Sequence, residues 1–341
     1  MRVLLLRRQP FGGLAAFTDE LARVLGQHGF SAEIEDASEW IPNETGSKSD
    51  REPTRRLRER ASGYQLAHAF GYRCAWAGAE AFGDREAWVY TAWDAPKTTH
   101  RLLIDRLNCA QAGFCVSHGV LQALDRALAL DLSYAPPGVE PPSGEVPDRA
   151  GMREEIRIPK DGPLVGAMGR WDEESGLLAL IESFERVWDE HPEARLAIAG
   201  KGPFSEALAK AAEAATKPDR IHLLGLLDDP GSFQSALDLF VAPRTRASVS
   251  MAALEAMSRE IPVLVRHSGS LPELVDPEIS GYLFDSDEQL GSRIAELLSV
   301  PLTLETVGRA GRLRVMERFT LEQAAQSVVE VYRTILQDVT P

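Results

Sequence analysis

Short apolar runs of strand length alternate with helix-like patterns along most of this chain. A first series places strands at 3–6, 65–67, 88–90 and 114–116, with a helix near 14–27. Alternating strands and helices are typical of βαβ units, whose strands form a parallel sheet. The chain is therefore predicted to be an α/β protein.

A stretch rich in proline and glycine interrupts this pattern between residues 131 and 150, at a density that neither a helix nor a central strand tolerates. A second alternating series follows, and 341 residues fit two domains of roughly 150 to 200 residues each. Two helical stretches are expected to close the chain. The expected organisation is an N-terminal domain over 1–135, a linker over 136–150, a second domain over 151–320 and a C-terminal helix over 321–341 that packs back toward the first domain.

In the first half of the chain, residues 42–60 are expected to form an exposed loop that leads into a short helix.

The second series has the same alternation of strands and helices as the first. The second series predicts strands at 163–168, 195–199, 221–224, 239–242 and 261–265, with helices near 176–189, 204–215 and 251–259.

The formal net charge is −14 and is unevenly distributed. Residues 1–150 carry 17 Lys and Arg against 20 Asp and Glu, whereas the remainder carries 20 against 31. An acidic protein repels a phosphate backbone, so no nucleic-acid partner is expected. One basic run, at 55–60, is interpreted as a solvated helix face; the alternative is a contact with anionic lipid, so membrane contact is expected to be peripheral at most.

Cysteine usage and the N-terminus favour a cytoplasmic protein. The three cysteines are odd in number and lack metal-type spacing, which is typical of reduced, buried thiols. The apolar run at 1–6 is too short for a signal peptide or a membrane span, so we interpret it as a first strand.

Glycines, some beside a basic residue, follow three of the predicted strands. Ligands of open parallel sheets bind outside the carboxyl ends of the strands. There, glycine lets the backbone approach a ligand, and free helix N–H groups favour anions such as phosphate. The alternative for each glycine is a turn with a positive φ angle, and each motif taken alone leaves both open. The motifs are Gly12-Gly13, Gly169-Arg170 with Gly176 at the next helix start, and Gly200-Lys201-Gly202-Pro203.

Longer motifs between residues 160 and 320 make a resemblance specific. They are Gly169-Arg170, Ala199-Gly200 with Gly202-Pro203, Leu224-Gly225, Leu254-Glu255-Ala256-Met257 and Leu271-Pro272-Glu273-Leu274-Val275. In this order they resemble the retaining, two-domain (GT-B) glycosyltransferases of family 4, the group 1 glycosyl transferases. The N-terminal half is similar more loosely, through Gly12-Gly13, His68-Ala69, Val89-Tyr90-Thr91 and Pro137-Gly138-Val139-Glu140.

The resemblance implies two Rossmann-like domains whose parallel sheets face each other across a cleft, and a nucleotide diphosphate-sugar donor bound mainly by the second domain. Glu255 matches the carboxylate that grips the ribose diol, and Arg170 matches the cation beside the diphosphate leaving group, so both are the catalytic candidates. The donor-binding candidates are Gly12, Gly13, Arg170, Gly200, Lys201, Gly225, Leu226, Arg244, Glu255, Ser268, Gly269 and Ser270.

By the same resemblance, the reaction is the transfer of a hexose to an acceptor with retained anomeric configuration. Enzymes of this kind need no metal and no other cofactor. The acceptor is expected to be a small molecule, a glycan or a lipid-linked molecule, and His68 and Trp93 are the candidates for its side of the site.

Three positions depart from the family pattern. Ser175 stands where the family has a second lysine for the diphosphate, Ala247 stands where a glutamate touches the donor sugar, and Trp93 stands where a histidine faces the reacting carbon. Either other cations have taken over these roles, or the chain is an inactive subunit or scaffold that retains the fold. A nucleotide-sugar epimerase of the same architecture is a third alternative. The replacement candidates are Arg244, Arg246, Lys201 and Arg266.

Other chemical motifs have simpler explanations. Asp285-Ser286-Asp287 has the D-x-D pattern of a metal site but precedes a predicted helix, where Asp and Ser are ordinary caps. The seven histidines are scattered without metal-type spacing, so no zinc site is expected. Histidines placed like His68 and His118 are more often structural than catalytic.

Overall fold

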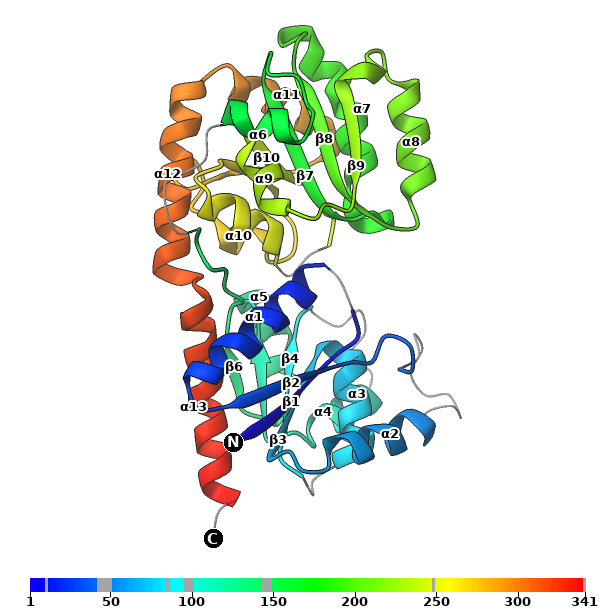
Figure 1. Ribbon diagram of the computed structural model, residues 1–341, viewed down its shortest axis with the longest axis vertical. Helices are drawn as coiled ribbons and strands as arrows, with labels where there is room; N and C mark the ends of the chain where they lie inside the picture. The colour runs from blue at the N-terminus through cyan, green and yellow to red at the C-terminus, as the bar shows by residue number, and fades with distance from the viewer. Residues whose placement is uncertain are drawn as a thin grey trace. The chain divides into compact units, whose positions relative to one another are not determined.

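The protein folds into two compact units, each built around a six-stranded sheet. The computed structural model describes residues 1–9, 12–41, 51–83, 86–94, 101–142, 149–246 and 249–339. The first unit comprises Met1–Gly138 with Leu321–Pro341, and the second comprises Val139–Thr320. All strand pairs in both sheets are parallel. The predicted α/β class with two parallel sheets is therefore confirmed (Figure 1).

The first sheet has the strand order β2-β1-β3-β4-β5-β6. Its central strands are apolar and buried on both faces, as expected of a parallel sheet covered by helices. Helices α1 and α13 pack together on one face, and α2, α3 and α4 lie on the other (Figure 1). The elements are β1 (Arg2–Arg7), α1 (Gly13–Gln27), β2 (Ser31–Asp36), α2 (Arg51–Ala61), β3 (Leu66–Phe70), α3 (Gly71–Phe82), β4 (Trp88–Ala92), α4 (Arg101–Leu107), β5 (Ala112–Cys115), α5 (His118–Asp125), β6 (Leu132–Tyr134) and α13 (Leu321–Val339).

Two strands of this sheet were absent from the sequence prediction. Strand β2 is an edge strand whose residues are mostly half-buried and whose sequence holds one Ile between acidic residues. Strand β6 has three residues and lies inside the proline-rich stretch at 131–150, which was expected to be irregular. Both were missed because an edge strand needs little apolar surface. Of the expected loop and helix at 42–60, residues 42–50 lie outside the described residues, and the helix begins at Arg51.

The second sheet has the strand order β12-β11-β10-β7-β8-β9, so the order reverses between β7 and β10. Helix α7 packs against α11 and α8, over a core that fills one side of this sheet. The elements are α6 (Arg149–Glu155), β7 (Leu164–Arg170), η2 (Glu173–Ser175), α7 (Leu177–Glu190), β8 (Arg195–Lys201), α8 (Ser205–Ala214), η3 (Pro218–Arg220), β9 (Ile221–Gly225), α9 (Pro230–Ser235), β10 (Leu239–Ala242), α10 (Met251–Ser258), β11 (Val263–Arg266), η4 (Leu271–Leu274), β12 (Tyr282–Phe284), α11 (Asp287–Leu298) and α12 (Pro301–Arg318).

Three helices, α11, α12 and α13, close the chain where two helical stretches were expected. The first two belong to the second unit, and α13 returns to the first unit, where it packs against α1. The hydroxyl of Tyr332 in α13 lies 2.6 Å from Nδ1 of His68 in β3, and its ring contacts that of Phe30. The two ends of the chain therefore share one core.

Candidate functional site

The carboxyl edge of the second sheet brings basic side chains together. Strand β7 ends at Arg170 and β8 ends at Lys201, and the parallel register pairs these two residues. Both are exposed. The prediction that they follow their strands is wrong by two residues, because backbone pairing continues through Gly169 and Gly200. Ligands of doubly wound sheets bind at this edge, beside the point where the strand order reverses.

A carboxylate joins the cations on the two sides of the reversal point. Arg244 follows β10, and its two terminal nitrogens bond to the two oxygens of Asp172, each at 3.0 Å. The Nε of Arg170 lies 3.6 Å from the same carboxylate. Asp172 therefore contacts guanidinium groups that come from neighbouring strands.

The glycines of this edge serve different purposes. A Cβ atom at Gly200 would lie 1.8 Å from the carbonyl oxygen of Gly169, and one at Gly176 would lie 2.1 Å from that of Pro243. These two glycines allow backbone to pack on backbone. Gly225 has a φ of 69° with nothing within 4 Å of such an atom. Gly169 likewise has nothing within 4 Å of such an atom. At Gly169 and Gly225 the open space therefore fits the predicted close approach of a ligand, and Leu226, next to Gly225, is an exposed apolar side chain.

Glu255 lies in the second turn of α10 and is held by a buried amide. Nε2 of Gln234, a fully buried side chain of α9, donates to Oε2 of Glu255 and to the carbonyl oxygen of Ala252, each at 3.1 Å. Burial raises the pKa of Glu255, whereas the hydrogen bond from Gln234 and the charge of Arg259 oppose that rise. The carboxylate is thus oriented and only partly exposed to solvent.

The turn after β11 carries the remaining donor candidates of this unit. The hydroxyl of Ser268 donates to the carbonyl oxygen of Thr245 at 2.6 Å, which ties this turn to the segment after β10. Gly269 has a φ of 58°, and Ser270 is the buried N-cap residue of η4. The three residues therefore lie at the same edge of the sheet as Arg244.

Arg266 does not fit the role of a replacement cation. Its side chain is buried, its Nε donates to the carbonyl oxygen of Pro243 at 2.8 Å, and its guanidinium pairs with Asp287. It also lies over the ring of Phe284, with 4.8 Å from its central carbon to the ring centroid. Arg266 therefore holds the sheet edge together.

The candidates of the first unit lie at the carboxyl edge of its sheet, with one exception. Gly12 is the N-cap residue of α1, and Gly13 is its first residue. Trp93 directly follows β4 and packs against Phe17 of α1, with ring centroids 5.7 Å apart. These positions agree with the strand-end placement inferred from the sequence.

His68 is the exception. It was expected to follow a strand, but it lies in the middle of β3 and is fully buried. Its Nδ1 is 2.6 Å from the Tyr332 hydroxyl and its Nε2 is 2.7 Å from the Thr91 hydroxyl. Burial lowers its pKa to about 3. We therefore assign His68 a structural role in joining β3, β4 and α13. His118 begins α5, as the structural interpretation predicted.

Two side chains of this site were not found from the sequence. Asp172 stands in an acidic run after β7, so its position at a strand end was the available signal. Gln234 belongs to α9, a six-residue helix that the apolar pattern did not predict. Its contact with Glu255 joins residues 21 positions apart, which no local pattern indicates.

The D-x-D motif is occupied by intramolecular contacts. Helix α11 begins at Asp287, with Ser286 at the N-cap position but without a side-chain cap hydrogen bond. Asp285 bonds to Nδ1 of His267 at 2.8 Å, and Asp287 pairs with Arg266. Within the described part of the chain, no three His, Cys, Asp or Glu side chains gather in a way that would hold a metal ion.

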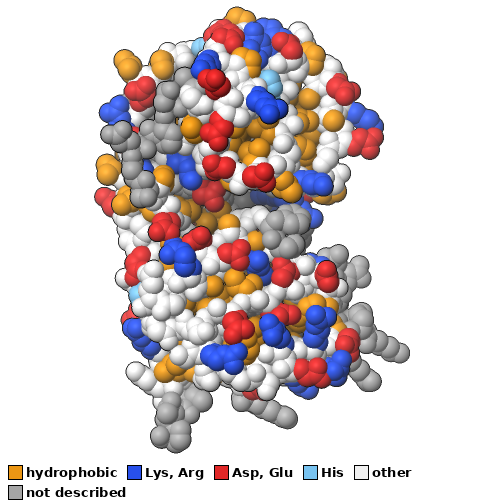
Figure 2. All heavy atoms as spheres, in the orientation of Figure 1, with side chains coloured by type: hydrophobic (Ala, Val, Ile, Leu, Met, Phe, Trp, Pro, Cys, Tyr) orange, Lys and Arg blue, Asp and Glu red, His pale blue; other side chains and the backbone are white. Residues whose placement is uncertain are grey.

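The basic run of α2 is engaged within the first unit. Arg55 pairs with Glu52 and Glu59, Arg58 donates to the carbonyl oxygen of Ala81, Arg60 pairs with Glu35, and Arg56 lies over the ring of Trp40. These contacts favour the solvated helix face. Figure 2 shows basic and acidic side chains interspersed on the face that it draws. No described helix combines the length and apolar composition of a membrane span.

Residues 148–314, which include this sheet edge, match the family model described as glycosyl transferases group 1. The second unit is a group 1 glycosyl transferase domain. The resemblance stated from the motifs of this half is thereby confirmed.

Solved structures that are similar over nearly the whole chain give its fold as GT-B. Sucrose-phosphate synthase from Thermosynechococcus elongatus is similar with a TM-score of 0.84 and 20% identity, over 99% of both chains. HepE from Anabaena, solved in complex with UDP-glucose, is similar with a TM-score of 0.80 and 18% identity, over 98% of this chain and 100% of that chain. At these identities the likeness shows the fold.

Curated relatives align with this chain over part of their own length. The D-inositol 3-phosphate glycosyltransferase of Segniliparus rotundus is 28% identical over 258 residues, which are 72% of this chain and 57% of that protein. Two further relatives are matched over 49% and 51% of their own length. The chain thus spans about half the length of these relatives.

Two of the three positions that depart from the glycosyl transferase pattern, Ser175 and Trp93, lie in the described residues. Ser175 is buried at the end of η2, and its hydroxyl accepts a hydrogen bond from the backbone N–H of Leu177 at 3.4 Å. A short side chain here supports the start of α7. Trp93 packs on α1, as described above. Ala247 lies outside the described residues.

Proposed function

We propose that this protein transfers a sugar from a nucleoside diphosphate-sugar to a hydroxyl group of an acceptor, with retention of the anomeric configuration. The observation that carries the proposal is the register of β7 and β8, which sets Arg170 beside Lys201 at the carboxyl edge of a reversing sheet. Paired cations at this place suit a diphosphate. The match to a group 1 glycosyl transferase family supports the same reaction class.

Each candidate residue is assigned to one part of the nucleotide-sugar. Glu255, oriented by Gln234, accepts hydrogen bonds from the two ribose hydroxyls. Gly225 and Leu226, at the end of β9, lie beside the base. Arg170 and Lys201 face the diphosphate. Backbone N–H groups of the turns at Gly12-Gly13 and at Ser268 to Ser270 supply further hydrogen bonds to the nucleotide-sugar.

The transfer breaks the bond between the anomeric carbon and the diphosphate oxygen, and its electron pair stays on that oxygen. A bond forms between the anomeric carbon and the acceptor oxygen, whose proton is released. Negative charge therefore grows on the leaving diphosphate, and cations placed beforehand stabilise it. We propose that arginine and lysine side chains do so without a metal ion or other cofactor.

The substrates are proposed only as classes. HepE was solved with UDP-glucose, which supports a nucleoside diphosphate-sugar as the donor class. The name of the Segniliparus rotundus relative includes an inositol phosphate, which supports an acceptor with several hydroxyl groups. A small molecule, a glycan and a lipid-linked molecule all meet that description.

Calorimetry with uridine and guanosine diphosphate tests donor binding. The wild-type protein is expected to bind one of them, and Glu255→Ala is expected to weaken that binding by about 10- to 100-fold, because charged hydrogen bonds to the ribose are lost. Equal affinity of the two proteins would refute the assignment of Glu255.

Release of nucleoside diphosphate from a panel of nucleotide-sugars, with and without a mixture of acceptors, tests transfer. Release is expected to depend on the acceptor and to fall by about 100-fold or more in Arg170→Ala. The inactive-subunit alternative rests on Ser175, Ala247 and Trp93, and it predicts binding without release. Release of an epimer or of free diphosphate without acceptor would favour the epimerase.

A further inference from the structure

The ion pair with Asp172 holds the guanidinium of Arg244 in one orientation. The guanidinium meets the carboxylate end-on, with two parallel hydrogen bonds of 3.0 Å. The two side chains are 29% and 26% exposed, so solvent reaches both. An end-on pair uses two of the five N–H groups of an arginine and leaves three outside the pair. The orientation of Arg244 is therefore fixed without exhausting its donors.

The pair also spans the reversal point of the sheet. Asp172 follows β7 and Arg244 follows β10, which are neighbouring strands. The backbone N–H of Thr245 donates to the carbonyl oxygen of Glu174 at 2.9 Å, so the two strand ends are joined by backbone as well. Because Arg170 also faces Asp172, two arginines from opposite sides of the reversal point converge on one carboxylate.

The other candidate cations are less suited to this position. Arg266 is buried and paired with Asp287. Arg246 is exposed and lies two residues farther from the end of β10. Lys201 stands on the far side of Arg170, on β8. Arg244 is thus a partly exposed cation, close behind β10, whose direction a carboxylate fixes.

We propose that Arg244, oriented by Asp172, is the second diphosphate-binding cation of this protein and takes the place of the lysine that is absent at Ser175. The proposal rests on the proposed function and extends it. It implies that the site discriminates a nucleoside diphosphate from the corresponding monophosphate through Arg244, while Glu255 contributes equally to both.

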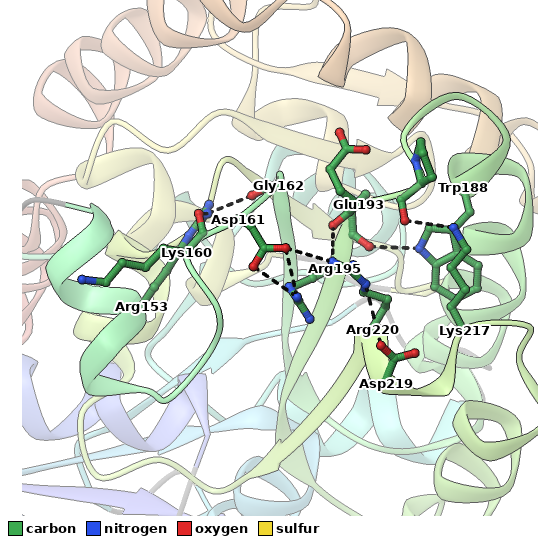
Figure 3. Close-up of polar contacts among 12 residues, drawn as sticks. Arg153, Lys160, Asp161, Gly162, Trp188, Glu193, Arg195, Lys217, Asp219 and Arg220 are labelled. Carbon is green, nitrogen blue, oxygen red and sulfur yellow. Dashed lines mark hydrogen bonds and ion pairs between the residues drawn. The ribbon is translucent and has the colours of Figure 1, made fainter.

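The test compares Arg244→Gln with a matched control, Arg220→Gln. Arg220 belongs to the same unit, has a similar exposure of 23%, and bonds to Asp161 and to the carbonyl oxygen of Glu193 (Figure 3). It directly precedes β9, so it lies at the amino edge of the sheet, opposite the proposed site. Loss of an arginine and its ion pair is thus common to both variants, and only the place differs.

Affinities for uridine diphosphate and monophosphate, or the guanosine pair if that binds more tightly, are measured by calorimetry. Arg244→Gln is expected to lose about 10- to 100-fold in diphosphate affinity and less than about threefold in monophosphate affinity. Arg244→Lys is expected to recover part of the loss, because the charge returns without the two-pronged geometry. Arg220→Gln is expected to change neither affinity. Thermal melts establish that each variant is folded, and the lysine variant keeps the test decisive if the glutamine variant is not.

Equal losses for diphosphate and monophosphate, or no loss in Arg244→Gln, would overturn the inference. If Glu255→Ala and Arg170→Gln weaken diphosphate binding in the same experiment, the proposed function survives that outcome. If the wild-type protein binds no nucleoside diphosphate, both the proposed function and the inference are wrong.

A double-mutant cycle tests the role of Asp172 as the positioning residue. Asp172→Asn removes a negative charge near the proposed phosphate position and also removes the partner that orients Arg244. Alone, this substitution could therefore raise or lower the affinity for nucleoside diphosphate. The informative quantity is coupling: Arg244→Gln is expected to cost at least threefold less in diphosphate affinity when Asp172 is already Asn. Additive effects on binding would leave Asp172 as a purely structural partner and would contradict its positioning role.

Discussion

At the scale of single residues, the site depends on how buried polar groups are held. Glu255 is partly buried in α10, and Gln234 supplies a hydrogen bond to its carboxylate from a neighbouring helix. Arg259, the C-cap residue of α10, adds a positive charge that is itself near Asp229. In the proposed contact with the ribose, Glu255 accepts hydrogen bonds in its ionised form, so this proposal makes nucleotide binding depend on the side chains that set the pKa of Glu255.

Gln234→Leu tests this dependence. Loss of the hydrogen bond removes an influence that lowers the pKa of Glu255, so this pKa is expected to rise. Nucleoside diphosphate affinity should then decline on acidification at a higher pH than in the wild-type protein. Calorimetry between about pH 5 and pH 8 measures the difference, since titration of the ligand is common to both proteins. Coincident pH profiles would show that Gln234 does not tune Glu255.

At the scale of secondary-structure elements, sequence pattern and structure agree where burial is complete. Strands β7, β8 and β10 were predicted because buried parallel strands are continuous apolar runs. Strands β2 and β6 were missed because they lie at the edges of the first sheet.

The site could be predicted in part. Arg170 and Glu255 became candidates through the family resemblance, and Lys201 and Arg244 are basic residues close behind predicted strands. Their mutual contacts were not found, because the ion pair of Asp172 with Arg244 joins residues 72 positions apart. The roles of the glycines also required coordinates, since Gly200 and Gly225 look alike in sequence and differ in what surrounds them.

Gly200→Ala is the prediction at this scale. The added Cβ would meet the carbonyl oxygen of Gly169, and the φ of 132° is unfavourable for alanine. The free energy of unfolding is expected to fall by about 2 to 4 kcal/mol. Gly26→Ala in α1 is the comparison, because nothing lies within 4 Å of its added atom; it is expected to be neutral or stabilising. Urea unfolding measures both, and an unchanged Gly200→Ala protein would contradict the packing role.

At the scale of the whole molecule, the chain returns to its first unit at the end. Helix α13 belongs to the same unit as β3, and the His68–Tyr332 hydrogen bond joins residues 264 positions apart. Both ring nitrogens of His68 are engaged and the ring is fully buried, so the native state contains it in the neutral form. The protonation of one histidine is thereby coupled to the folding of a unit made from both ends of the chain.

The stability of the first unit should therefore depend on pH through His68. In the unfolded chain this histidine binds a proton below its ordinary pKa of 6.5, whereas in the folded unit its pKa is about 3. Its contribution is present above pH 6.5 and is lost as the pH falls toward 3, by about 1.4 kcal/mol per pH unit. His68→Gln should lose less stability than the wild-type protein between about pH 6.5 and pH 4 in urea unfolding. Equal losses would contradict the buried neutral state.

A structure of the protein with the nucleoside diphosphate that binds most tightly tests the proposed site. Phosphate oxygens are expected within hydrogen-bond distance of the Arg170 guanidinium, and both ribose hydroxyls are expected on the Glu255 carboxylate. A nucleotide bound away from the carboxyl edge of the second sheet, or a Glu255 side chain that remains packed against its neighbours while the ligand is bound elsewhere, would contradict it.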